Sequence, residues 1–247
     1  MNGYAAPEQQ QDIDVLHEIG ERIAAADPLW TVLKLVVELV STVVKCDSCF
    51  LYVLEGNELI LRASQNPHAE VVNRLTLRMG QGITGWVAEN KKPVAIANRA
   101  AFDPRFQSFH ELPEDRFEAF LSVPILCRDK LVGVINLQHR EAYTYSRQEI
   151  RLISMVGFLV GPEIELARLE AESSRFSELA EAQQLVQTAT GILQRNWQVT
   201  LEEASSVLRR EGRERRRSLK EIAEAILIVD EIERGRNRPP GASFSLR

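Results

Sequence analysis

The chain has 247 residues, of which 45% are hydrophobic and 26% charged, and its formal net charge is −5. This length is sufficient for one sizeable hydrophobic core and a second, smaller one. The negative net charge excludes a protein that binds nucleic acid over its whole surface, so any such site must be local. The three cysteines are an odd number, which argues against a disulfide framework and favours a reducing cytoplasm as the location.

The N-terminal part of the chain is predicted to be helical. Residues 1–12 have no periodic pattern, and we expect them to be disordered before a helix that begins at Ile13. A second helix is expected up to Lys45, with Asp27 as its N-cap and Pro28 at its first helical position. The apolar stretch 32–44 is shorter than the ~20 residues that a membrane span requires, so we predict a buried amphipathic helix.

Runs rich in β-branched and aromatic residues predict an antiparallel sheet after these two helices. The predicted strands are residues 49–54, 59–63, 93–96, 120–126 and 131–138. The last two flank a short turn at 128–130 and form a strong hairpin. Ser146 and Glu149 have the spacing of a capping box and open a helix through Leu159. This order of elements predicts an α+β domain in which helices cover one face of the sheet.

Two short motifs in this region have alternative interpretations. Gly80 to Trp86 is glycine-rich like a phosphate cradle but lacks the Lys-Ser/Thr ending of a P-loop, and we favour a tight turn into a helix over 82–90. Cys46 and Cys49 form a C-x-x-C pair that could bind zinc or carry out redox chemistry. Because no second pair follows, packing at a helix-to-strand junction is the simpler interpretation.

Four segments of this region together resemble a GAF domain. They are Gly80–Ala88, Lys92–Ile96, Ser122–Ile125 and Gly133–Leu137. We therefore predict a GAF-like sensor domain over residues 13–160. The resemblance implies a domain that binds a small molecule or only dimerises. The cyclic-nucleotide signature of some members begins at Asn98-Arg99 but does not continue, so we expect no cyclic nucleotide.

The resemblance leaves the ligand of the sensor domain unknown, and the sequence indicates neither a metal nor a nucleotide cofactor. Aromatic and polar side chains on the predicted strands and the following loop are candidate ligand contacts. The candidates are Tyr52, Leu54, Phe102, Phe106, Phe120 and Gln138. The same residues could instead fill the hydrophobic core, and the sequence does not separate these alternatives.

A helical linker is predicted over residues 161–184. Gly161-Pro162 could kink it, since proline removes one backbone hydrogen bond. Beyond the proline, apolar residues recur at heptad-like intervals, with a phase slip near Ser174. They are Ile164, Ala167, Ala171, Phe176, Leu179 and Val186. This pattern predicts a short, weak parallel coiled coil and, with it, a homodimer.

The last part of the chain is predicted to be an all-α module of three short helices over residues 185–234, followed by a disordered tail over 235–247. Thr200 with Glu203 and Ser218 with Glu221 each have the spacing of a capping box, which marks two helix starts. Gly212 is expected to end the helix between them, because glycine adopts a left-handed C-cap without steric cost.

A basic segment separates the last two predicted helices. From 209 to 220 it has seven basic and two acidic residues, a local charge of +5. Such a segment favours a polyanion, because the neutralisation of phosphates releases condensed counterions. The alternative is an ordinary solvated face. The candidate phosphate contacts are Arg209, Arg210, Arg213, Arg215, Arg216, Arg217 and Lys220, with Arg195 as a neighbour. Trp197 is a further neighbour, although we expect it in the core.

The same region resembles the ANTAR domain, a three-helix module that binds RNA hairpins in bacterial transcription antitermination. The residues that carry the resemblance are Ala189–Leu193, Thr200–Ala204, Leu208-Arg209 and Ser218–Ala225. The family often has lysine where this chain has Thr190, so the arginines would have to provide more of the phosphate contacts. The resemblance implies that the module binds unpaired bases of hairpin loops in leader transcripts.

These observations support two hypotheses about function. In the first, the sensor domain binds a ligand and controls an RNA-binding module that promotes antitermination. In the second, the first domain dimerises without a ligand and the helical tail binds a protein partner. An enzyme is not expected, because the four histidines are scattered and no spacing indicates a catalytic triad or a metal cluster.

Overall fold

The computed structural model forms two compact units, residues 1–169 and 170–247. The residues whose structure is described are 7–25, 28–65, 71–107 and 117–236. The predicted disordered segment 1–12 lies partly outside this range. Helix α1, however, begins at Pro7 and ends at Ala24, so residues 7–12 are helical. Within the described residues, no helix is long and apolar enough to cross a membrane.

The first unit is built on a six-stranded antiparallel sheet with the strand order β3-β2-β1-β6-β5-β4. The strands are β1 Ser48–Glu55, β2 Glu58–Gln65, β3 Thr76–Arg78, β4 Val94–Ile96, β5 Ala119–Cys127 and β6 Lys130–His139. All five predicted strands are present, and the sequence analysis missed only the three-residue β3. Arg128 and Asp129 both have positive φ angles of 48° and 62°, as a two-residue hairpin turn between β5 and β6 requires.

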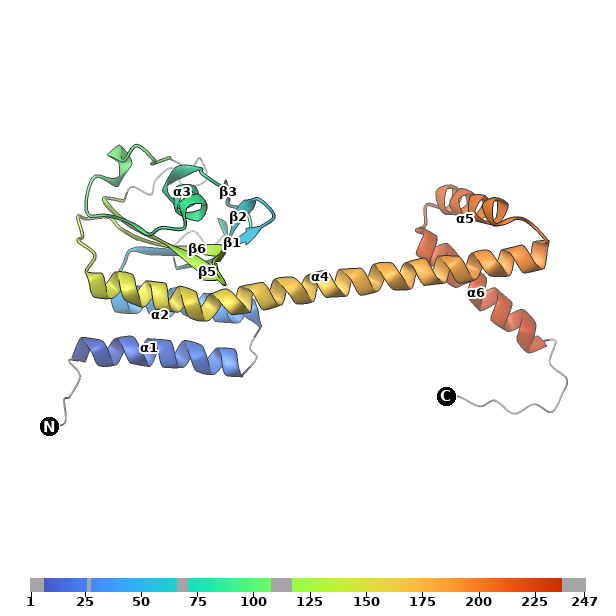
Figure 1. Ribbon diagram of the computed structural model, residues 1–247, viewed down its shortest axis with the longest axis horizontal. Coiled ribbons are helices and arrows are strands. Elements are labelled where there is room, and N and C mark those ends of the chain that lie inside the picture. Colours follow the sequence, from blue (N-terminus) through green and yellow to red (C-terminus); the bar gives the residue numbers. More distant parts are fainter. Residues whose placement is uncertain (1–6, 26–27, 66–70, 108–116, 237–247) are drawn as a thin grey trace. The chain divides into compact units, whose positions relative to one another are not determined.

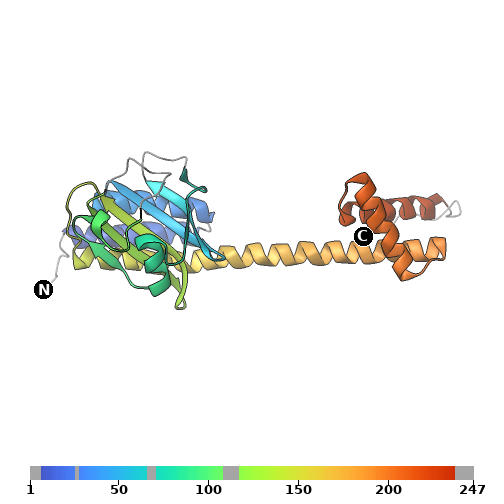
Figure 2. The same cartoon turned by 90° about the horizontal axis from the view of Figure 1, so that it is seen from above.

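The predicted α+β fold is confirmed, and most helices of this unit cover one face of the sheet. Helix α2, Leu29–Val44, and the first part of α4 pack against the strands, and α1 packs alongside them (Figures 1 and 2). Pro28 is the N-cap of α2 rather than its first helical residue. Helix α3, Gly82–Asn90, has the predicted bounds and packs on the opposite face through Ile83 and Val87. The interpretation of Gly80 to Trp86 as a turn into a packed helix is therefore confirmed.

Helix α4 runs without interruption from Arg147 to Trp197, a length of 51 residues. Its start is the predicted capping box, since Ser146 Oγ accepts from the Glu149 backbone N–H at 3.1 Å. The sequence predicted that this helix runs only through Leu159, but it continues to Trp197 with Pro162 inside it. Proline removes only one hydrogen bond of the ladder, and packing against the sheet on the preceding turns stabilises the helix there.

The second unit contains the end of α4 together with α5, Leu201–Arg215, and α6, Leu219–Arg236. Its small core contains two or more residues from each of these helices: Ala189, Leu193, Ala204, Leu208, Ile222 and Ala223. Both predicted capping boxes are present, with Glu203 N–H donating to Thr200 Oγ1 and Glu221 N–H donating to Ser218 Oγ. The predicted tail begins too early, because α6 includes residues 235 and 236. Residues 237–247 lie outside the described range.

Gly212 does not end α5, as the sequence analysis expected, but is a buried residue within it. The helix continues to Arg215, and Arg216 takes the left-handed C-cap conformation with φ 55°. Arg217 N–H then donates to the Gly212 carbonyl at 2.9 Å. A Cβ at position 212 would lie 3.1 Å from the carbonyl oxygen of Arg217, so the absence of a side chain allows the chain to turn back closely.

Candidate nucleic-acid interface

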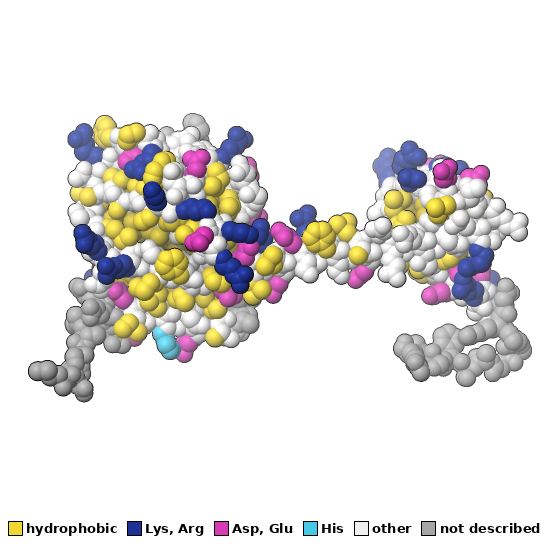
Figure 3. Space-filling view, in the orientation of Figure 1, with side chains coloured by type: hydrophobic (Ala, Val, Ile, Leu, Met, Phe, Trp, Pro, Cys, Tyr) yellow, Lys and Arg dark blue, Asp and Glu magenta, His cyan; other side chains and the backbone are white. Residues whose placement is uncertain are grey.

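The basic segment is mostly helical, because four of its arginines lie on α5 rather than in a turn. Arg216 is the C-cap of α5, Arg217 lies in the turn, and Lys220 is on the first turn of α6. All six arginines from 209 to 217 are exposed, whereas Lys220 is half-buried. Figure 3 shows Lys and Arg side chains gathered over α5 with acidic side chains among them.

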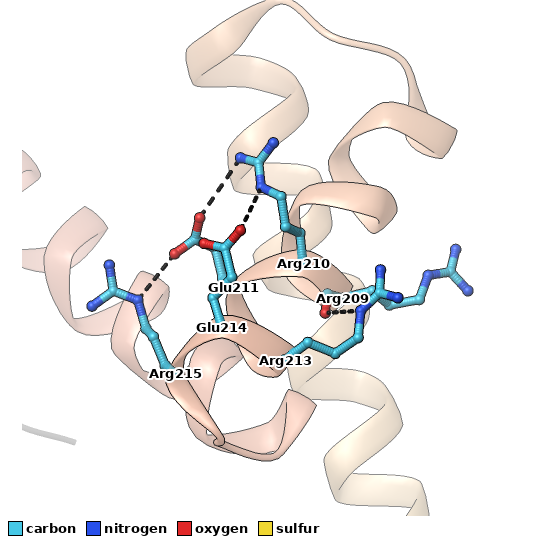
Figure 4. A network of polar contacts seen from close by, with 6 residues as sticks. All are labelled: Arg209, Arg210, Glu211, Arg213, Glu214 and Arg215. Atoms are coloured by element: carbon cyan, nitrogen blue, oxygen red, sulfur yellow. Dashed lines mark hydrogen bonds and ion pairs between the residues drawn. The ribbon is translucent and has the colours of Figure 1, made fainter.

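The arginines on α5 fall into two groups that point in different directions (Figure 4). Arg215 Nε donates to Glu211 at 3.0 Å, and Arg210 lies 3.6 Å from Glu211. Arg209 and Arg213 point away from these carboxylates, and Arg213 Nε donates to the Arg209 carbonyl at 3.4 Å. Among the described residues, no carboxylate forms an ion pair with Arg209, Arg213 or Arg216. These three guanidinium groups are therefore available to an external anion.

Two carboxylates in and beside the basic segment, Glu211 and Glu221, have lowered pKa values. A hydrogen bond from Arg215 lowers the pKa of Glu211 below its usual value. The Ser218 backbone N–H, followed by Arg217, lowers the pKa of Glu221 in the same way. Part of the local positive charge is thus neutralised internally, so the surface potential is concentrated on the unpaired arginines.

The remaining expected residues of this site lie near the end of α4. Thr190 is buried, and its hydroxyl donates to the Val186 carbonyl at 2.6 Å, so it offers nothing to a phosphate. Arg195 Nη2 lies 3.3 Å from Asp230 Oδ1. Trp197 is 57% exposed, which contradicts our expectation that it belongs to the core. It is the last residue of α4, where few neighbours surround a side chain.

Asp230 is a residue that sequence reasoning missed. Its side chain is only 9% exposed and forms ion pairs with Arg195 of α4 and Arg234 of α6. The distance from Arg234 Nε to Asp230 Oδ2 is 2.8 Å. Asn196 Nδ2 approaches the same carboxylate at 3.5 Å. The i,i+4 spacing of Asp230 and Arg234 was visible in the sequence, but the contacts from α4 depend on the tertiary fold. These contacts bring two arginines beside one buried carboxylate.

The candidate ligand residues of the sensor domain are only partly brought together. Tyr52, Phe120 and Gln138 are buried in the layer between the sheet and α3, and Phe120 is paired with Gln138 across β5 and β6. Burial raises the pKa of Tyr52, which therefore stays protonated. Leu54 and Phe106 are partly buried beside this layer. Phe102 is 76% exposed, and the Arg99 guanidinium group lies over its ring, 4.8 Å from the ring centre. Phe102 is therefore not part of the buried layer between the sheet and α3.

The same sheet face carries a row of four side chains on neighbouring strands, three of them polar. Cross-strand pairing places Ser64, Phe50, Asn136 and Ser122 next to one another in that order. Asn136 Nδ2 donates to Thr84 Oγ1 of α3 at 2.7 Å. Within the described part of the chain, Ser64 Oγ, Asn136 Oδ1 and Ser122 Oγ are buried without a hydrogen-bond partner. Buried polar atoms without a protein partner are uncommon, and these three could hydrogen-bond a small polar molecule.

The three cysteines form no disulfide bond with one another. Cys46, Cys49 and Cys127 are free thiols, and burial raises the pKa of Cys46 and of Cys49. A raised pKa lowers the fraction of reactive thiolate. Among the described residues, no group of three or more His, Cys, Asp or Glu side chains could hold a metal ion.

Comparison with known proteins finds two family matches in this chain. The family model described as GAF domain matches residues 28–164, which is more than half of the chain. The model described as ANTAR domain matches residues 175–227. The GAF match covers the sheet, α2, α3 and the first part of α4, and the ANTAR match covers α5, half of α6 and the end of α4.

Individual relatives are similar to part of this chain. A protein of Escherichia coli (strain K12) described as "Phosphoenolpyruvate-dependent phosphotransferase system" is 28% identical over 64% of this chain and 20% of its own length. A Nif-specific regulatory protein of Azospirillum brasilense is 29% identical over 49% of this chain and 20% of its own length. The GAF domain from a phosphoenolpyruvate-protein phosphotransferase of Coxiella burnetii is 27% identical, covers 68% of this chain and 99% of that chain, and has a TM-score of 0.62. The chain thus spans about a fifth of the length of these curated relatives.

Proposed function

Since the chain belongs to the GAF family and carries an ANTAR domain behind its GAF domain, we propose that it is a regulator that binds RNA hairpins and promotes transcription antitermination. In this proposal the GAF domain senses a signal and the ANTAR domain carries the RNA site. The protein acts by binding and performs no reaction of its own. ANTAR domains are RNA-binding, and this supports RNA as the partner.

The observation that carries the RNA proposal is the group of unpaired arginines on and beside α5. Arg209, Arg213 and Arg216 are exposed and, among the described residues, form no ion pair with a carboxylate. A chain with a net charge of −5 repels RNA over most of its surface, so a local cationic group has to provide the attraction. Arginine is suited to this role because its planar guanidinium group binds phosphate oxygens through two hydrogen bonds.

Filter binding of a hairpin RNA in graded salt tests this proposal. The test variant replaces Arg209, Arg213 and Arg216 with Ala. The control replaces three exposed sensor-domain arginines, Arg128, Arg140 and Arg147, and changes the net charge equally. We expect the test variant to bind more weakly and the salt slope of log K to fall by about 2, at ~0.7 per lost phosphate contact. Equal binding and an equal slope in test and control variants would place the RNA site elsewhere.

We further propose that a small molecule binds the GAF domain on the sheet face that faces α3. The support is the row of unpartnered buried atoms on Ser64, Asn136 and Ser122. A ligand there controls RNA binding only if it binds one conformational state of the protein more tightly than the other. Native mass spectrometry of protein purified from its host would detect a bound molecule. A domain that stays empty and shows no thermal shift across a metabolite panel would count against sensing.

We propose that two copies of the chain associate in parallel through α4. Exposed apolar residues on this helix follow heptad a and d positions: Met155, Leu159, Leu166, Leu169 and Phe176. This line of heptad residues differs from the set predicted from the sequence. Ile164 of the predicted set is only 3% exposed and belongs to the core of the first unit. Apolar side chains at this spacing are typical of a seam that a second helix covers.

A further inference from the structure

The ANTAR unit contains a cavity of about 450 Å³ between the end of α4, α5 and α6. Its volume lies within the ~300–1,000 Å³ that is typical of sites for small ligands. Apolar side chains from all three helices form its wall, among them Leu193, Val207 and Ile226. The exposed ring of Trp197 also lines it. The cavity therefore presents one large flat aromatic surface beside an aliphatic wall.

The polar lining of this cavity comes from a few side chains. Asn196 and Asp230 line it together, and Asp230 is the buried carboxylate that Arg195 and Arg234 contact. Glu211 and Glu233 are the other lining carboxylates, and Glu211 is bound by Arg215, which also lines the cavity. Asp230 and Glu211 are thus held in place by arginines, whose guanidinium groups remain more than half exposed.

We propose that this cavity binds one unpaired nucleobase from the loop of an RNA hairpin, with the base stacked on Trp197 and its amino edge directed to Asp230 and Asn196. The inference rests on the RNA binding proposed above and deepens it by naming the chemical group that is recognised. A nucleobase has an apolar face and a polar edge, which matches a cavity with an aromatic surface, an aliphatic wall and a few hydrogen-bonding groups.

The charge of the lining selects among the bases. A carboxylate accepts hydrogen bonds and donates none when it is ionised, so it pairs with an exocyclic amino group. Adenine, cytosine and guanine carry such a group, whereas uracil does not. Arg195 and Arg234 pair with Asp230 and Arg215 pairs with Glu211, and their exposed guanidinium groups would bind the flanking phosphates of the loop. The site therefore excludes uracil at one loop position.

Hairpins that share one stem and carry a fully randomised loop provide the test, with the full-length chain as bait. We expect the selected loops to contain one position without uridine. Trp197→Ala should weaken binding of a selected hairpin by about 5- to 150-fold, the loss of one stacked base, while Trp197→Phe retains most of the affinity. Trp30→Ala is the matched control, since Trp30 is also exposed, at 69%, but lies on α2. Asp230→Asn, which offers a donor at the same position, should admit uridine.

The outcomes separate this inference from the proposal beneath it. If the wild-type chain enriches no hairpin, RNA binding itself fails and the base site fails with it. If the wild type binds a selected hairpin but Trp197→Ala binds equally well, or if uridine is tolerated at every loop position, RNA binding stands and the base site is overturned. If Trp197→Ala changes the sedimentation of the protein but not its affinity for RNA, the cavity is a protein contact and the inference is wrong.

Discussion

The backbone carbonyl of Leu126 lies where a side chain on Gly161 would have to be placed. A Cβ at position 161 would be 2.4 Å from the Leu126 oxygen, a separation that real Cβ atoms do not adopt. Helix α4 thus packs directly against the backbone of β5 one residue before Pro162. This contact explains why the proline is tolerated within the helix, because the packing fixes the backbone on both sides of the missing hydrogen bond.

We predict that Gly161→Ala destabilises the GAF domain by about 1–3 kcal/mol, since the added methyl group forces α4 away from β5. The control is Gly157→Ala, one turn earlier on the same helix. There the added Cβ would lie 3.5 Å from the nearest backbone oxygen, which is ordinary van der Waals contact. Urea unfolding of the full chain measures both variants. Equal stabilities for the two variants would contradict the close packing at residue 161.

The capping boxes of the ANTAR unit should contribute to its stability. Thr200→Ala and Ser218→Ala each remove an oxygen that accepts a backbone N–H at the start of a helix. We expect each change to cost about 1 kcal/mol in the unfolding of this unit. Thr188→Ala serves as the control, because the Thr188 hydroxyl only bonds back to the Gln184 carbonyl within α4. Differential scanning calorimetry would show whether the cap variants melt below the control.

Stability of the GAF domain should fall as the pH drops through about 6.5, because His139 is buried between Tyr143 and Tyr145. Burial lowers the pKa of His139, against the opposing charges of Asp47 and Glu149. The folded state therefore takes up a proton less readily than the unfolded chain, and protonation below that pH favours unfolding.

The His139→Gln variant should lose less stability than the wild type between pH 7.5 and pH 5.5. His17→Gln is the control, since the His17 side chain is 71% exposed. Denaturant unfolding at a series of pH values measures the slope. If His139→Gln and wild type show the same pH dependence, His139 is not the group responsible.

The proposed dimer seam predicts a selective effect of charge on α4. Leu166→Glu places a carboxylate on the exposed heptad line beside Glu165, and we expect the dimer dissociation constant to rise by at least about tenfold. Leu179→Glu is a matched control, because Leu179 is equally apolar and 67% exposed but lies outside the line. Analytical ultracentrifugation compares the two. A monomeric wild type, or equal weakening by both changes, would contradict the seam.

The fold was largely predictable because its signals are local. Runs rich in β-branched and aromatic residues predicted β5 and β6, and the capping boxes at Ser146, Thr200 and Ser218 marked three helix starts. The errors arose where tertiary contacts override local preference. The helix that begins at Arg147 was expected only through Leu159, with a kink at Pro162, but it continues to Trp197. Gly212 suggested a helix end where it provides room for a close backbone contact.

The candidate site was less predictable than the fold. The sequence shows that arginines are dense between 209 and 217, but it does not show which of them are already paired with carboxylates. In the sequence, nothing distinguishes Asp230 from the other acidic residues of its helix. Its contacts with Arg195 and Asn196 arise only because α4 and α6 pack together. The neighbouring positions of Ser122 and Asn136 on the GAF sheet also depend on the pairing of two different strands.

RNA capture in living cells tests the central claim most directly. Ultraviolet crosslinking of the full chain in its host, followed by sequencing of the attached RNA, should recover leader transcripts that contain hairpins. The Arg209, Arg213 and Arg216 triple-alanine variant should recover far fewer of them. Recovery of no transcripts by the wild-type chain would contradict the account, and so would equal recovery by the variant.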